Sequence, residues 1–191
     1  STRWPCPPRF RSDAAHAGIA ASMYALGIVC DSLSERGAAR QWYEQSLAMY
    51  KRVYGEDAAH AHIAASMHAL GNVCHRQGEC GAARQWHERS LAMMKRVHGG
   101  DAAHPSLAQT YGMLAQLYLN DQDFEAAART CISWTACHQR LREQGGRVDP
   151  AEEQVLEQVE QALEKREHDP RYQRMQRMRA KVARRKAAQR S

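Results

Sequence analysis

Residues 57–100, DAAHAHIAASMHALGNVCHRQGECGAARQWHERSLAMMKRVHGG, decide the fold of this chain, because residues 13–56 repeat them almost unchanged. A shift of one repeat aligns about 31 identical residues in 44, for example Ile19 with Ile63. A third, more divergent copy begins at Asp101. Self-similarity at this period is typical of stacked supersecondary units, none of which can bury its apolar face alone. The sequence therefore predicts a repeat protein.

Apolar residues within each copy recur at helical spacing. In the second copy they fall at i, i+4, i+7 and i+11, so one stripe of the segment is expected to face inward. A turn at Gln77-Gly78 separates this segment from a second amphipathic segment. Each copy is therefore predicted to be a helix hairpin. The expected inward stripes of the first helices are Ile19, Met23, Leu26 and Cys30, then Ile63, Met67, Leu70 and Cys74, then Leu107, Tyr111, Leu114 and Tyr118.

The residues of the hairpin carry a family resemblance. Leu70-Gly71, Cys74, Ala83 and the ring at Tyr43 resemble the tetratricopeptide pattern of leucine, glycine, aromatic, alanine and aromatic. Residues 70–93 are similar to the longer repeats of kinesin light chains, as is His104-Pro105 before the third copy. The resemblance covers about residues 13–144 and implies an all-α fold, a right-handed α-solenoid of three helix hairpins. Ala115 replaces the packing glycine in the third copy.

Proline and glycine place the boundaries of the chain's segments. Trp4-Pro5-Cys6-Pro7-Pro8 predicts an extended arm, because proline fixes φ and restricts the residue before it. Ser12 or Asp13 is expected to cap the first helix. Asp149-Pro150 predicts the start of a helix that caps the last repeat. The expected segments are an arm at 1–12, repeats at 13–56, 57–100 and 101–144, a capping helix at 145–169 and a basic helical tail at 170–191.

The differences between the two near-identical copies gather on one face of the first helix, opposite the inward stripe. In tetratricopeptide proteins this face lines the concave groove, and Asn72 matches an asparagine that contacts bound peptide backbone in kinesin-light-chain-like repeats. Either these exposed positions drifted after duplication or they were adapted to a protein partner, and both interpretations stay open. The predicted groove residues are Tyr24, Ile28, Asp31, His68, Asn72, His75, Arg76, Gln116 and Asn120.

Positive charge is concentrated at the C-terminal end. Nine lysines or arginines and no acidic residue follow Pro170, whereas the rest of the chain has more acidic than basic residues. Such asymmetry usually indicates an interaction segment. We expect this tail to be helical and to bind an acidic surface, which RNA, an acidic protein or an anionic membrane could provide. The predicted basic anchor is Arg171, Arg174, Arg177, Arg179, Lys181, Arg184, Arg185 and Lys186.

Motifs for catalysis or cofactor binding are absent from the sequence. It contains no GxxxxGK[ST], GxSxG, HExxH or GxGxxG, so we expect no enzyme and no cofactor. The best candidate metal set, Cys74, His75, Cys80 and His87, has no tight ligand pair. His16, His60 and His104 occupy equivalent loop positions and are expected to share a structural role.

Cysteine usage and apolar stretches bear on the compartment. The six cysteines include no CxxC pair, so they are interpreted as structural thiols rather than as a disulfide or zinc site. This favours a reducing intracellular compartment, cytoplasmic or organellar, with a mitochondrial address open. No apolar stretch is long enough to predict a membrane span, and no secretory signal is visible.

Two classes of function remain open. The first is a non-catalytic interaction scaffold or adaptor, a subunit of a larger assembly that binds protein partners through the groove and the tail. The second is an RNA-associated subunit, for example of an organellar ribosome, anchored through the tail. A steep salt dependence of RNA binding would favour the second class, because neutralising several phosphates releases counterions.

Overall fold

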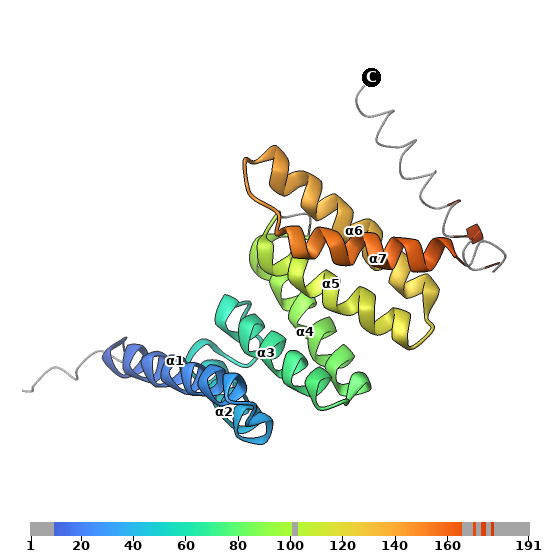
Figure 1. Cartoon of the computed structure of the whole chain (residues 1–191). Helices are drawn as coiled ribbons and strands as arrows, with labels where there is room; N and C mark the ends of the chain where they lie inside the picture. Colours follow the sequence, from blue (N-terminus) through green and yellow to red (C-terminus); the bar gives the residue numbers. More distant parts are fainter. Residues whose placement is uncertain (1–9, 101–102, 166–169, 171–172, 175–176, 178–191) are drawn as a thin grey trace, which may run out of the picture. The chain divides into compact units, whose positions relative to one another are not determined.

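The computed structural model describes residues 10–100, 103–165, 170, 173–174 and 177. Over these ranges the chain forms helices α1–α7 and contains no strand (Figure 1). The chain divides into two compact units, Ser1–Val97 and His98–Ser191, which we call unit 1 and unit 2. The prediction of an all-helical fold built from helix hairpins is confirmed. The right-handed course of the solenoid stays a prediction.

Unit 1 contains the first two hairpins. They are formed by α1 (Phe10–Ser32) with α2 (Arg36–Tyr54) and by α3 (Ala61–Arg76) with α4 (Cys80–His98). The same buried hydrogen bond joins the helices of each pair: Ser46 Oγ donates to Ala20 O and Ser90 Oγ donates to Ala64 O, both at 2.8 Å. Since a hydroxyl can reach a helical carbonyl only at close approach, the equivalent serines mark a close contact in both hairpins.

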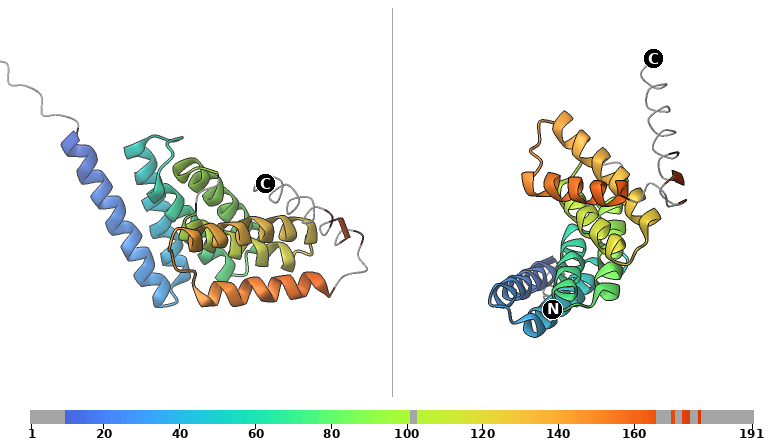
Figure 2. Two further views of the ribbon diagram at one scale, coloured as in Figure 1. Left: turned by 90° about the horizontal axis from the view of Figure 1, so that it is seen from above. Right: turned by 45° about the vertical axis from the view of Figure 1, so that its right-hand side comes forward.

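Unit 2 contains the third hairpin and its cap. The hairpin is α5 (Pro105–Asn120) with α6 (Phe124–Glu143), and α7 (Pro150–Glu164) packs against both helices (Figure 2). Asp149 caps α7 by accepting a hydrogen bond from Ala151 N at 2.9 Å. Val159 and Leu163 are the buried residues of α7. The Asp-Pro start and the packing of α7 agree with the expected capping helix.

A ring from the second helix lies against a glycine of the first helix in both hairpins of unit 1. A Cβ atom on Gly27 would lie 2.5 Å from the Tyr43 ring, and one on Gly71 would lie 2.6 Å from His87 Nε2. Separations below 3.0 Å are not tolerated by real Cβ atoms, so each ring requires its glycine. The leucine-glycine pair noted in the sequence therefore has a direct packing reason.

In the third hairpin, the glycine that faces a ring lies one turn earlier along the first helix. Ala115 occupies the place of Gly71, as the sequence shows, but Gly112 supplies the missing space and a Cβ there would lie 2.8 Å from Trp134. Cys131, which replaces the ring at this position of the second helix, leaves room for the larger indole. The third hairpin therefore keeps a glycine beside its ring, but at a different position. Trp134 is buried, with 1% of its surface exposed.

The expected inward stripe of the first helix is wrong in one respect. Ile63 and Leu70 are fully buried in α3, but their equivalents in α1, Ile19 and Leu26, are 45% and 43% exposed. The physical reason is that α2 packs against α3 from the preceding hairpin, whereas no described helix precedes α1. The same apolar pattern is therefore covered in one copy and open in the other.

The start of the first helix also differs from the prediction. Because α1 begins at Phe10, neither Ser12 nor Asp13 is its cap, and residues 10–12 are helical instead of extended. His16 lies inside α1, whereas its equivalents His60 and His104 are the N-caps of α3 and α5. The shared loop role predicted for three histidines therefore holds for two. The proline-rich residues 1–9 lie outside the described residues.

Candidate partner-binding groove

An ion pair joins two predicted groove residues on the first helices of unit 1. Arg76 Nη2 on α3 donates to Asp31 Oδ2 on α1, and the two side chains are 41% and 20% exposed. These residues were predicted as groove residues from their differences between copies. The contact brings the C-terminal ends of α1 and α3 together. We call Ile28, Asp31, Asn72, His75 and Arg76 the α1–α3 face.

Two predicted groove positions belong in part to the core of their own hairpins. The Tyr24 ring lies 5.3 Å from that of Tyr43, and the His68 ring lies 5.0 Å from that of His87. The first member of each pair comes from the first helix and the second from the second helix. Burial raises the pKa of Tyr24 and raises that of Tyr43 to about 12. The difference between Tyr24 and His68 therefore changes a packing contact inside the hairpin.

The histidine pair is held in its neutral form. Burial lowers the pKa of His68 to about 4. Burial, and then the neighbouring His68 and His75, lowers the pKa of His87 to about 3. Neither ring nitrogen of His87 has a hydrogen-bond partner among the residues that the structure describes. These two histidines are therefore uncharged near neutral pH.

The surface that remains available on the α1–α3 face is small and chemically mixed. Ile28 is 50% exposed, and Asn72 is partly exposed one repeat further on. An asparagine amide both donates and accepts, so Asn72 has the chemistry to bind an extended peptide backbone. Asp31 and Arg76 flank this surface with opposite charges. Such a surface suits a peptide with an apolar side chain better than a uniformly charged ligand.

The remaining predicted groove residues belong to unit 2. Gln116 is partly exposed on α5, and Asn120 is exposed at its C-terminal end. Both side chains are accessible, which a groove contact requires. Their participation in one groove with the α1–α3 face stays a prediction.

The basic anchor is described only at Arg174 and Arg177, which are exposed helical residues. The other predicted anchor residues, Arg171, Arg179, Lys181, Arg184, Arg185 and Lys186, lie outside the described residues. Within the described ranges, no helix is long and apolar enough to cross a membrane.

The candidate metal set is not brought together as a site. No group of three or more histidines, cysteines or acidic residues in the described part of the chain could hold a metal ion. None of the cysteines described there forms a disulfide: they are Cys30, Cys74, Cys80, Cys131 and Cys137.

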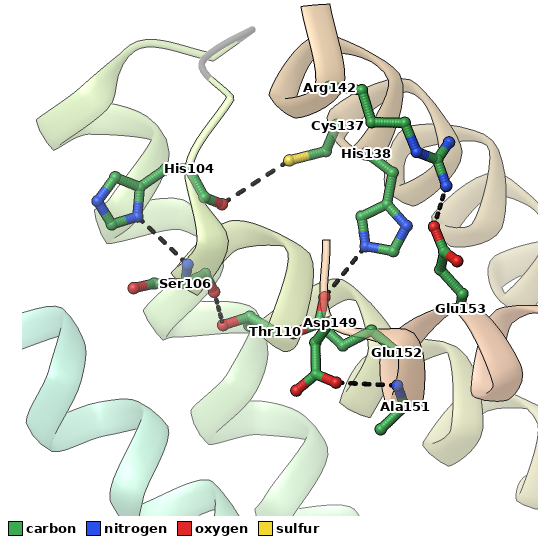
Figure 3. A network of polar contacts seen from close by, with 10 residues as sticks. All are labelled: His104, Ser106, Thr110, Cys137, His138, Arg142, Asp149, Ala151, Glu152 and Glu153. Atoms are coloured by element: carbon green, nitrogen blue, oxygen red, sulfur yellow. Dashed lines mark hydrogen bonds and ion pairs between the residues drawn. The ribbon is translucent and has the colours of Figure 1, made fainter. Parts of the chain in front are cut away.

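Two polar networks of unit 2 were not predicted from the sequence. His138 Nε2 lies 3.1 Å from Glu152 Oε2 and joins α6 to α7, and Arg142 pairs with Glu153 next to it (Figure 3). The adjacent residue of α6 makes a separate contact, in which Cys137 Sγ donates to His104 O at 3.8 Å. In the sequence, the only sign of the contact between α6 and α7 was a histidine at an apolar position of α6, because its acidic partner belongs to a separate helix.

Stacked rings at the joints between repeats were also missed. Tyr54 at the end of α2 stacks on His60 with ring centroids 3.6 Å apart, and the equivalent residues in unit 2, His98 and His104, stack at 4.0 Å. Each pair packs the end of one repeat on the N-cap of the next. The sequence signal was present, since rings recur at both equivalent positions.

These hairpins can be compared with known proteins. Tetratricopeptide repeat models match residues 19–61 and 62–130, which together make up more than half of the chain. The chain is a tetratricopeptide repeat protein. Its long period agrees with the kinesin-light-chain-like variety that the residues predicted.

Solved structures share the fold of this tetratricopeptide repeat protein. The crystal structure of BtubC (BKLC) from P. vanneervenii matches with a TM-score of 0.65 and 22% sequence identity. The match covers 86% of this chain and 64% of that chain, so this chain spans less than two thirds of its neighbour. At this identity the likeness supports the fold alone. A search of the curated proteins found no match.

Proposed function

We propose that this tetratricopeptide repeat protein is a non-catalytic scaffold that binds a peptide segment of a protein partner along the α1–α3 face. The Asp31–Arg76 ion pair is the observation that carries the proposal, because it connects predicted groove residues of two successive first helices. Tetratricopeptide repeats in general mediate protein–protein interaction. The expected ligand is an extended segment that offers backbone amides to Asn72 and an apolar side chain to Ile28.

The ion pair itself contributes little to folding. Exposed pairs of this kind are typically worth about 0 to 1 kcal/mol, since water and salt screen both charges. Replacing Arg76 and Asn72 should therefore disturb a bound peptide far more than it disturbs the hairpins. That separation makes the proposal testable.

The test compares Asn72→Ala/Arg76→Ala with the unmodified chain in affinity purification followed by quantitative mass spectrometry. The control is Gln45→Ala/Gln85→Ala, which removes exposed residues of the second helices α2 and α4. We expect partners that depend on the α1–α3 face to be lost from the first variant only, while both variants keep the melting temperature. Equal partner sets for all three proteins would contradict the proposal.

The compartment and the tail are part of the same proposal. Buried thiols such as Cys74 and Cys131 support a reducing intracellular compartment, cytoplasmic or organellar. The concentration of nine basic residues after Pro170 supports an anchoring role for the tail within a larger assembly. Removing residues 170–191 should release the protein from that assembly with the repeats still folded. A truncated chain that co-purifies fully with its partners would refute the anchor.

RNA is the second candidate ligand, and only the charge of the tail favours it. If the tail lies along a phosphate backbone, the logarithm of the binding constant for single-stranded RNA should fall steeply with the logarithm of salt concentration. The slope should nearly disappear when residues 170–191 are removed. A shallow slope in the full chain would leave the protein scaffold as the function.

A further inference from the structure

One side of α1 is an apolar surface whose equivalent in α3 is covered. The residues at five equivalent positions are identical in the two helices, but they are exposed in α1 and buried in α3. Val29, for example, is 52% exposed, whereas Val73 is fully buried. We call this side of α1 the end face. It consists of Ile19, Ser22, Ala25, Leu26 and Val29, and its buried equivalents are Ile63, Ser66, Ala69, Leu70 and Val73.

The internal repeat shows what covers such a surface. Both helices have a partner within their own hairpin, but α3 has in addition α2 of the preceding hairpin packed against it. Specific contacts fix α2 in this position: Arg40 Nη1 pairs with Glu79 Oε2 at 2.9 Å, and the Tyr54 ring stacks on His60. The difference in exposure between the two copies therefore corresponds to a second helix of the α2 type.

The end face is flanked by the residues that would recognise such a helix. Glu35 follows α1 at the position where Glu79 follows α3, and it is exposed. His16 is the equivalent of His60, on which Tyr54 stacks. An arginine near the start of an incoming helix would therefore meet Glu35, and a ring near its end would meet His16.

The end face lacks the polar surface that closes a repeat stack. Residues 14–30 contain no acidic residue, lysine or arginine, and every exposed large hydrophobic side chain in the described part of the chain lies between Ile19 and Leu33. By contrast, α7 presents exposed Glu153, Glu157 and other polar residues outward from the third hairpin. A polar outer face of this kind closes a repeat stack. A contiguous apolar surface of the α1 kind marks an interaction site.

We propose that the end face binds the second helix of a further tetratricopeptide repeat. The helix has an apolar and aromatic stripe, an arginine near its start and a ring near its end, as α2 has. A second copy of this chain does not offer α2 for this purpose, because α3 already covers it. The proposal is independent of the α1–α3 face, since it uses other residues of α1.

A peptide with the sequence of residues 36–54 tests the proposal against the full chain. Its binding is measured by fluorescence anisotropy with a labelled peptide. Because an isolated helix of this length is marginally stable, the same sequence is also fused ahead of Ser1 through a flexible linker, which raises its effective concentration to about millimolar. In the fusion, hydrogen exchange of the α1 amides reports on coverage of the end face.

Substitutions identify the surface that is bound. Leu26→Arg should weaken peptide binding at least tenfold and remove the protection of α1 in the fusion. The reason is that it places a charged side chain between the end face and the bound helix. Gln45→Arg adds the same charge at an exposed site on α2 and should change neither result. Glu35→Arg should weaken binding several-fold, and a peptide carrying Arg40→Glu should restore it.

Other results would contradict the proposal. If the peptide neither binds nor protects α1 in the fusion, or if Leu26→Arg binds as the wild type does, the end face does not accept an α2-type helix. Sedimentation supplies the third outcome. A wild-type chain that dimerises and becomes monomeric on Leu26→Arg substitution would show that a second copy covers the end face, and the proposal would then be wrong.

Discussion

Replacing the histidine pair of the second hairpin by the tyrosine pair of the first should remove much of the acid sensitivity of unit 1. His68 and His87 occupy the positions of Tyr24 and Tyr43, with similar ring separations of 5.0 and 5.3 Å. Gly71 leaves the same space beside the ring as Gly27 does. The double substitution His68→Tyr/His87→Tyr should therefore be accommodated by packing that the chain already uses.

The magnitude follows from the two pKa values. Burial lowers them to about 4 and about 3 in the folded protein, whereas both are 6.5 in the unfolded chain. Since the folded pKa is the lower one, the contribution to stability is complete above pH 6.5 and is lost as pH falls toward 4. At pH 5 each histidine favours the unfolded chain by about 2 kcal/mol, because only the unfolded state is protonated there. The pair together should cost about 4 kcal/mol.

Urea unfolding at pH 7.5 and pH 5.0 checks this value. Between these two conditions, the wild type should lose about 4 kcal/mol more of its free energy of unfolding than the double variant does. A His16→Gln variant controls for loss of an exposed histidine and should behave as the wild type. Equal losses in the wild type and the double variant would mean that the charged rings are accommodated in the fold, which would refute the argument from burial.

Three further predictions concern packing and the cap. Leu70→Ala, at a fully buried position, should lower the free energy of unfolding by about 2 to 5 kcal/mol in urea titration. Gly112→Ala should destabilise by about 1 to 2 kcal/mol because of the Trp134 ring, whereas Gly18→Ala, with open space around its Cβ position, should stabilise slightly in the same assay. Glu152→Ala leaves a buried histidine without its partner, so hydrogen exchange of α7 should accelerate about tenfold or more, and an unchanged rate would contradict the role of this contact.

Periodicity predicted the hairpins because the repeat supplied the same evidence twice. Spacing of i, i+4, i+7 and i+11 identified Ile63, Met67, Leu70 and Cys74, all of which are buried in α3. The turn at Gln77 was predicted from its glycine neighbour, and the residue is the C-cap of α3. Such local signals are sufficient for helices whose packing partners are adjacent in the sequence.

The same signals could not predict which apolar faces are covered. The pattern shows that one side of a helix is apolar, but burial depends on a neighbouring element that the pattern does not contain. Leu26 and Leu70 are identical in type and local context, yet one is 43% exposed and the other is fully buried. In the same way, the change from Tyr24 to His68 looked like a change at a groove surface. Its companion change from Tyr43 to His87 shows that a packed pair was exchanged together.

The pentapeptide DAAHA shows how far this dependence on neighbours reaches. Residues 13–17 are helical within α1, but in the identical residues 57–61 the helix begins only at Ala61. In the second copy Gly55 has a φ of 105° and ends α2, and Tyr54 stacks on His60, which then accepts a hydrogen bond from His62 N at 3.2 Å. None of these neighbours exists ahead of the first copy in the described residues, so the chain continues the helix that alanine favours. If a second helix of the α2 type binds the end face, His16 gains the ring that His60 has, and the two copies of DAAHA should then adopt the same structure.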